Sequence, residues 1–177
     1  MLGKGYGEMR KILTGLYIIF VLSGATLAHS KLVDIKRFVH CAVGTEVDDA
    51  SKVKSPRLIC LGKSDNSRDR AVVILACTRE VFATILQAGT QSHTAETIDV
   101  AYRFDKEKLS TESWGYTNNR AVNLIENSHH HFVERIARAQ KLVFEVGKEA
   151  GAVNLTGSAD AVTEYKKRCS TLDRSIK

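Results

Sequence analysis

The chain has 177 residues, a length that suits one domain once any processed segment is removed. Its 26 lysines and arginines outnumber its 20 acids, which gives a formal net charge of +6. The basic residues are scattered among acids, so no stretch is dense enough to predict a nucleic-acid-binding surface.

The N-terminus has the three parts of a secretory signal peptide. Met9–Lys11 is a short basic start, Ile12–Gly24 is an almost uninterrupted apolar run, and small and polar residues follow it. The apolar run has about 13 residues, fewer than the roughly 20 that span a membrane. We therefore expect residues 1–30 to be a cleaved export signal, with the cut after Ala28 or Ser30. An uncleaved N-terminal anchor is the alternative. Cleavage would leave a periplasmic or secreted protein without a stable membrane span.

All four cysteines lie beyond this segment: Cys41, Cys60, Cys77 and Cys169. An even number of cysteines in an exported chain predicts two disulfides. Of the three possible pairings we favour Cys41–Cys60, which closes a short loop, with Cys77–Cys169, which ties the central sheet to the last helix. A zinc site is the competing interpretation, but no two cysteines have the spacing of a CxxC knuckle.

The first mature stretch, 31–60, is irregular, with a brief helix or strand at 57–61, and a highly charged loop follows at 63–70. Runs of β-branched residues and alternating hydrophobicity then predict strands. The six expected strands are 71–77, 81–86, 97–105, 121–125, 141–146 and 152–155. The first three have short links, which predicts an antiparallel meander. Trp114 is expected in the loop that follows the third strand.

Two helices are expected from apolar residues at helical spacing. Phe132, Ile136 and Ala139 mark the first helix, and Val162 and Tyr165 share one face of the last helix with Cys169. The predicted fold is therefore α+β, a mainly antiparallel sheet of about six strands with two helices packed on one face or edge, stapled by disulfides. We expect a single domain over residues 31–169 and a flexible tail over 170–177.

The residues that suggest chemistry each have a simpler explanation. Residues 129–131 are three adjacent histidines at a helix start, and they would point in directions about 100° apart, too divergent to bind one metal. Ser158 lacks the nucleophile-elbow pattern and is explained as a helix cap. Four acids are candidates for a glycan-hydrolysing carboxylate pair: Asp99, Asp105, Glu107 and Glu112. We expect no catalytic residue, metal or cofactor.

The candidate partner-binding patch is Trp114 with Tyr116, flanked by Arg103 and Arg120. Aromatic residues and arginine dominate the energetics of protein interfaces. The alternative is that Trp114 packs on the core, because a lone tryptophan in a small domain usually buries most of its ring.

One order of motifs resembles a known family. A cysteine pair opens it (Cys41 and Arg57–Cys60), and a strand ending at Cys77 follows. Then come Tyr102–Asp105, Trp114, Phe132–Val133, Ala139–Leu142, and Leu155–Ser158 before a helix with Cys169. This order resembles the VasI family, small exported proteins associated with type VI secretion. The resemblance implies an accessory or interaction protein of the cell envelope, and it carries over no catalytic residue.

The sequence thus predicts a non-enzymatic periplasmic accessory or binding protein with a protein partner in the cell envelope, and the VasI resemblance implies an association with type VI secretion. The first alternative is an inhibitor or immunity protein against an exported cell-wall hydrolase. The second alternative is an envelope hydrolase. A flat sheet face would favour the accessory protein, a protruding loop with a basic or aromatic tip the inhibitor, and a cleft with paired carboxylates the hydrolase.

Overall fold

The computed structural model describes residues 30–65, 70–89 and 94–172, so nearly all of the expected export signal lies outside the described residues. The first strands are β1 (Lys31–Arg37), β2 (Cys41–Val47), β3 (Lys54–Ser64), β4 (Ala71–Cys77) and β5 (Phe82–Ala88). The next are β6 (Thr97–Phe104), β7 (Ser110–Thr117), β8 (Arg120–Asn123), β9 (Lys141–Val146) and β10 (Glu149–Asn154). Two helices are described, α2 (Glu126–Arg138) and α3 (Ser158–Leu172). Neither described helix is long and apolar enough to cross a membrane.

The ten strands form one antiparallel sheet in the order β1-β2-β3-β10-β9-β6-β7-β8-β5-β4, and β3 also pairs with β4. That last pairing closes eight strands into a barrel and leaves β1 and β2 outside it. The closure depends on β3, which pairs along one edge with β4 and along the other with β2 and then β10. Gly62 lies where β3 passes from β2 to β10. A Cβ there would lie 1.9 Å from the carbonyl oxygen of Ala152, so only glycine permits this approach.

Alternation along each strand gives the barrel an inner face that is filled by side chains. At one end the filling is small, because a Cβ on Gly151 would lie 2.6 Å from the Cβ of Ala71. At the other end it is aromatic. The ring centroid of Phe132 on α2 lies 4.8 Å from that of Tyr102 and 5.6 Å from that of Trp114. The interior is therefore a packed core, as expected for eight strands.

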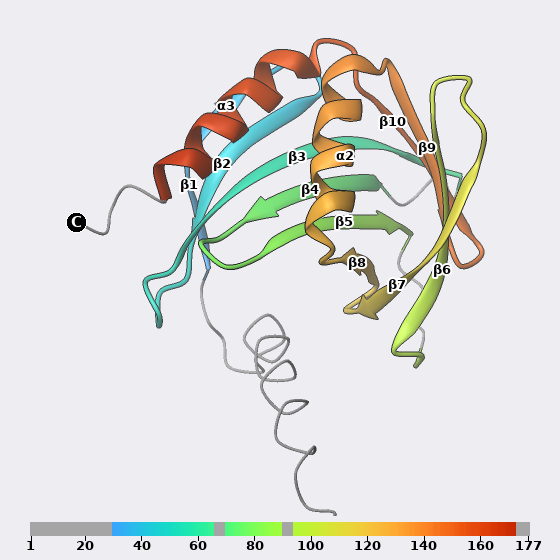
Figure 1. Cartoon of the computed structure of the whole chain (residues 1–177), viewed down its shortest axis with the longest axis horizontal. Helices are drawn as coiled ribbons and strands as arrows, with labels where there is room; N and C mark the ends of the chain where they lie inside the picture. Colours follow the sequence, from blue (N-terminus) through green and yellow to red (C-terminus); the bar gives the residue numbers. More distant parts are fainter. Residues whose placement is uncertain (1–29, 66–69, 90–93, 173–177) are drawn as a thin grey trace, which may run out of the picture.

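Both helices pack on the inner face of the sheet, and β3, β4 and β5 pass behind α2 in Figure 1. The buried residues of α3 include Val162 and Tyr165, as the helical spacing predicted. The helices are joined where Ser158 Oγ donates a 2.5 Å hydrogen bond to the carbonyl oxygen of Ile136. α3 continues to Leu172, beyond the expected start of the tail at residue 170, and residues 173–177 lie outside the described part.

The predicted six-strand sheet is wrong: the fold is a closed eight-stranded barrel with two outer strands, and about half of the described residues lie in strands. The six expected strands correspond to β4, β5, β6, β8, β9 and β10. Sequence reasoning missed β1 and β2, left β3 ambiguous, and placed β7 in a loop. β7 was missed because its inward positions include Glu112, whose carboxylate removes the apolar alternation. Of the predicted meander, the antiparallel pairing of β4 with β5 is present, but the placement of the third strand is wrong, because β5 pairs next with β8 and not with β6.

The two predicted disulfides are present, with the favoured pairing. Cys41 and Cys60 are directly opposite each other on β2 and β3, with Cα atoms 4.1 Å apart. Cys77, at the end of β4, is bonded to Cys169 on α3, 92 residues away. The second bond fixes α3 to the inner face of the sheet.

We expect Gly62→Ala to lower the free energy of unfolding by about 3 kcal/mol, because the new Cβ forces β3 and β10 apart. Urea unfolding of the oxidised protein measures this. Gly115→Ala is the matched control, since the nearest atom to its Cβ would be 3.4 Å away. Equal stabilities of the two variants would contradict the role assigned to Gly62.

Replacing Cys77 and Cys169 together by serine should cost about 4–5 kcal/mol of unfolding free energy, because the bond closes a long loop. The same change at Cys41 and Cys60, which are 19 residues apart, should cost about 3 kcal/mol. Urea unfolding of both double variants under non-reducing conditions tests the order. A larger loss for the Cys41–Cys60 pair would show that loop length does not set the stabilisation.

Candidate protein-binding surface

The four residues of the predicted partner-binding patch do not come together. Trp114 is 2% exposed, and its indole Nε1 donates to Glu112 Oε2 at 2.9 Å, so it belongs to the core. Tyr116, two residues on, packs partly buried against the same core. Arg103 and Arg120 are exposed on the outside. The register of β6, β7 and β8 sets them at opposite ends of these strands, on the order of 20 Å apart.

Glu112 anchors a polar cluster inside the barrel. Its Oε1 accepts a 2.5 Å hydrogen bond from the Tyr102 hydroxyl, and its Oε2 accepts from Trp114 and, at 3.4 Å, from Asn123 Nδ2. Burial and the neighbouring carboxylate raise the pKa of Tyr102 well above its usual range, so this hydroxyl stays a donor. The cluster is satisfied internally, as buried polar networks in folded proteins are.

Two of the other candidate carboxylates also have structural partners. Asp105 Oδ1 accepts hydrogen bonds from the backbone N–H groups of Gln140, at 3.0 Å, and Lys141, at 2.9 Å, just after α2. Glu107 forms an ion pair with Arg135, whose guanidinium carbon lies 4.7 Å from the ring centroid of Phe104. These contacts account for both acids without catalysis.

The three histidines point apart, as expected. His129 is buried between strand β5 and helix α3: its Nδ1 lies 3.2 Å from Thr84 Oγ1 and its Nε2 lies 3.2 Å from the Tyr165 hydroxyl. His130 is beside Glu126, and His131 is beside Arg135. Within the described residues no three His, Cys, Asp or Glu side chains are grouped as metal ligands. Burial, aided by nearby His130, lowers the pKa of His129 to about 4.

A groove of about 360 Å³ runs beside α2. Its lining is Phe104, Asp105, Glu107, His131, Glu134, Arg135, Arg138 and Ala139. Its two arginines are paired with acids of the same lining, because Arg135 pairs with Glu107 and Arg138 lies 3.6 Å from Glu134. The third acid, Asp105, accepts the backbone hydrogen bonds of Gln140 and Lys141, so each of these charged groups already has a partner within the protein.

The outer face of β3, β4, β5 and β8 is the unusual surface of the molecule. Cys77 and Thr84 contact the helices on the inner face, so the alternate residues of their strands point outward. We name the apolar residues of this outward set the isoleucine face. Its residues are Ile59, Leu61, Val72, Ile74, Ala76, Ala83, Ile85 and Val122.

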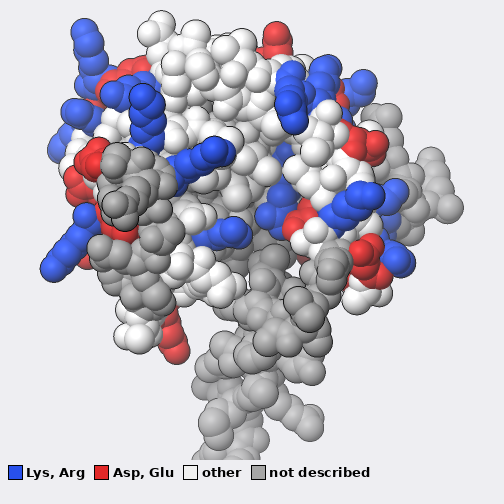
Figure 2. Space-filling model, turned by 180° about the vertical axis from the view of Figure 1, so that it is seen from behind, with Lys and Arg blue, Asp and Glu red and all other residues white. Residues whose placement is uncertain are grey.

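The residues of the isoleucine face touch one another across the strands. Ile74 is directly opposite Ile59 on one side and Ile85 on the other, and Ile85 is opposite Val122. Leu61, at the edge, is 45% exposed, whereas the central Ile74 is 8% exposed. Figure 2 views the molecule from the side opposite the helices and shows uncharged atoms over much of its upper middle, with lysines and arginines among them and around them.

The other half of the barrel provides an internal comparison. The outward residues of β6, β7 and β9 are mostly polar and include Asp99, Arg103, Thr111, Ser113, Lys141 and Glu145. Both halves enclose the same filled interior, so the apolar exterior of one half is not required by the barrel. No described helix packs on it, and a contiguous apolar patch on an outer surface is typical of a protein-binding site. Sequence reasoning took these runs as strands and assigned no function to them.

No family model, curated protein or solved structure matches this chain significantly. The resemblance to the VasI family stays a hypothesis based on the order of motifs.

His129 should make the fold sensitive to acid. Its pKa of about 4 in the folded state lies below the ordinary value of 6.5, so the unfolded chain binds the proton more readily. Stability is then complete above about pH 6.5, and about 3 kcal/mol is lost as the pH falls to 4. Urea unfolding between pH 7.5 and 4 should show this loss in the parent and in His131→Gln, but a smaller loss in His129→Gln. A loss of the same size in His129→Gln would exclude His129 as the cause.

Proposed function

We propose that the chain is an exported, non-enzymatic binding protein of the cell envelope that holds a protein partner on the isoleucine face. The observation that carries the proposal is the asymmetry of the barrel exterior, apolar over β3, β4, β5 and β8 and polar over β6, β7 and β9. The two disulfides indicate an oxidising, extracytoplasmic environment. A periplasmic location and a role in type VI secretion are part of the proposal, and the export signal and the VasI resemblance support them.

The contacts of the polar side chains support a binding role over a catalytic one. Glu112, Asp105 and Glu107 are each held by neighbours, and the barrel interior is filled with side chains. The outward face, in contrast, consists of side chains for which no described element provides a partner. Binding is the function that such a face serves.

The size of the isoleucine face suits the centre of an interface. Four strands about 4.8 Å apart, with three rows of outward residues on them, cover roughly 300 Å². Apolar patches of this size are often functional in monomers. A stable interface buries about 800 Å² on each partner, so the polar rim must contribute as well.

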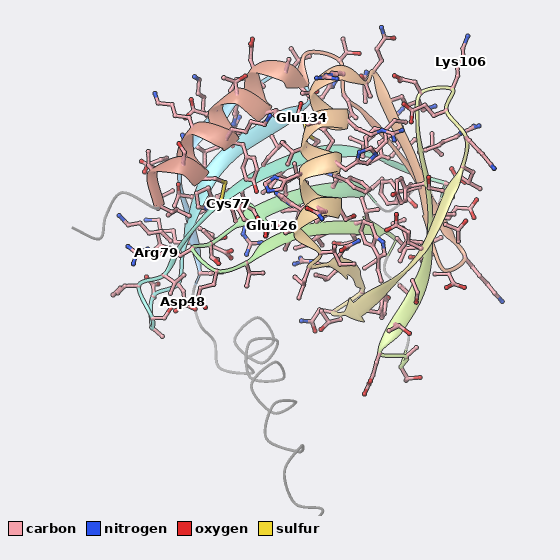
Figure 3. All side chains as sticks on the ribbon, viewed as in Figure 1. Asp48, Cys77, Arg79, Lys106, Glu126 and Glu134 are labelled. Carbon is pink, nitrogen blue, oxygen red and sulfur yellow. A yellow bond between two sulfur atoms is a disulfide. The ribbon has the colours of Figure 1, made fainter. Side chains whose placement is uncertain are left out.

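The inhibitor or immunity protein remains the second candidate, and one feature favours it. The turn between β6 and β7 carries Lys106 and Lys108 with Leu109, which is 56% exposed. Figure 3 shows Lys106 projecting from the tip of this turn. Asp105 and Glu107 of the same turn contact the backbone after α2 and Arg135, so the two lysines supply the charge at the tip. A protruding basic tip is the feature expected of a loop that enters the cleft of a hydrolase.

Site-specific photo-crosslinking in the producing cell tests the proposal. We expect benzoylphenylalanine at Val72 to crosslink one envelope protein, and the same group at Ser113, on the polar half, to capture none. Mass spectrometry identifies the captured protein, and calorimetry measures its Kd with the purified chain. Crosslinking at both sites alike, or at neither site, would contradict the proposal.

The two candidate functions are separated by a matched pair of leucines. Leu61→Gln, at the edge of the isoleucine face, should weaken binding of that protein at least tenfold, about 1.4 kcal/mol. Leu109→Gln, at the β6–β7 turn, should leave binding unchanged. The reverse result would favour the inhibitor.

A further inference from the structure

The isoleucine face has a cationic end. Lys63 follows Leu61 by two residues on β3, and Arg70 precedes Val72 by two residues at β4. Because Leu61 is opposite Val72, continuing this register sets Lys63 opposite Arg70. Both are exposed, and neither makes an ion pair within the described part of the chain.

Arg120 extends this end onto β8. Its Nε donates a 3.3 Å hydrogen bond to Gln87 Oε1, and Gln87 is directly opposite Val72. Three cations therefore border the row formed by Leu61, Val72 and Gln87. Arg120 belonged to the predicted partner-binding patch with Trp114. The structure instead sets it beside the row that contains Leu61 and Val72.

At the opposite end of the face, the outward cation of β3 is paired. Arg57, which is opposite Ala76, forms an ion pair with Glu46. Glu46 is the one acid among the outward residues of β2, β3, β4, β5 and β8, strands that are described in full. Positive charge is therefore concentrated at one end of an otherwise apolar surface.

We infer that the partner is a protein whose contact surface is apolar at its centre and carries carboxylates at one end, opposite Lys63, Arg70 and Arg120. This inference rests on the proposed function. Complementary charges at the rim steer the encounter and fix its orientation more than they add affinity. Exposed charges are screened by salt, so their contribution falls as ionic strength rises.

A second copy of the chain fits this face less well. Its own isoleucine face offers one acid, Glu46, and Arg57 already neutralises it, so a face-to-face dimer leaves the three cations without partners in either orientation. An anionic membrane would satisfy the cations, but membrane-binding surfaces insert protruding apolar side chains. Apart from Leu61 at the edge, the residues of this face lie largely covered between cross-strand neighbours, and Ile74 at its centre is 8% exposed.

The test uses the purified protein that crosslinks at Val72 and the mature chain with Lys63, Arg70 and Arg120 all changed to glutamate. We expect charge reversal to raise the Kd at least tenfold in 50 mM NaCl, with a smaller effect in 500 mM NaCl. The control changes Arg103 and Lys141, on the polar half, to glutamate and should leave the Kd unchanged. Circular dichroism and urea unfolding establish that both variants fold.

The outcomes separate this inference from the proposed function. If Leu61→Gln weakens binding and charge reversal does not, the partner is a protein without matching carboxylates and the inference fails alone. If neither change matters, the isoleucine face is not the interface and both proposals fail. Two results would overturn the choice of a different protein as the partner. One is binding of the mature chain to phosphatidylglycerol vesicles that is lost on charge reversal. The other is a concentration-dependent dimer in sedimentation equilibrium that is lost on charge reversal.

Discussion

The structure depends on the pairing of strand β3 with three neighbours. β2 and then β10 lie along one edge of β3 and β4 lies along the other, so this strand both closes the barrel and attaches the two outer strands. The change from β2 to β10 takes place where Gly62 allows the backbone of Ala152 to approach. One disulfide, Cys41–Cys60, joins β3 directly to β2. Without this junction the sheet would have open edges, which promote aggregation.

Because the barrel is closed, each of its strands has one face toward the interior and one toward the outside. The two faces of β4 have different roles. Cys77 binds α3 from the inside, while Ile74 lies in the outer row between Ile59 and Ile85. Because both helices cover the interior, the polar groups there must be satisfied within the protein. His129 between Thr84 and Tyr165, and Glu112 with Tyr102 and Trp114, meet that requirement. The conspicuous titratable residues therefore stabilise the fold, and the surface that we propose for binding is on the other side of the sheet.

This arrangement reconciles a filled barrel with the binding function that we propose. Barrels that bind small molecules keep space inside, whereas here Gly151, Ala71 and the aromatic cluster around Phe132 fill the interior. The apolar surface that remains is the external isoleucine face, which is bordered at one end by Lys63, Arg70 and Arg120. Such a surface suits recognition of another folded protein.

The sequence determined the strands with clear alternation, such as β6 with Val100, Tyr102 and Phe104. Its four cysteines predicted two disulfides and left three pairings open, of which the favoured one is present. The sequence did not reveal β7, since Glu112 and Ser110 interrupt the pattern, nor which strands pair, since pairing joins residues far apart in the chain. Nor did it reveal the isoleucine face, because Ile59, Ile74, Ile85 and Val122 belong to four separate strands. The apolar run of β4, Ala71–Cys77, is the pattern of a strand covered on both faces. Only the tertiary structure decides which face the helices cover, because that depends on long-range register, and so only the structure shows the face left for a partner.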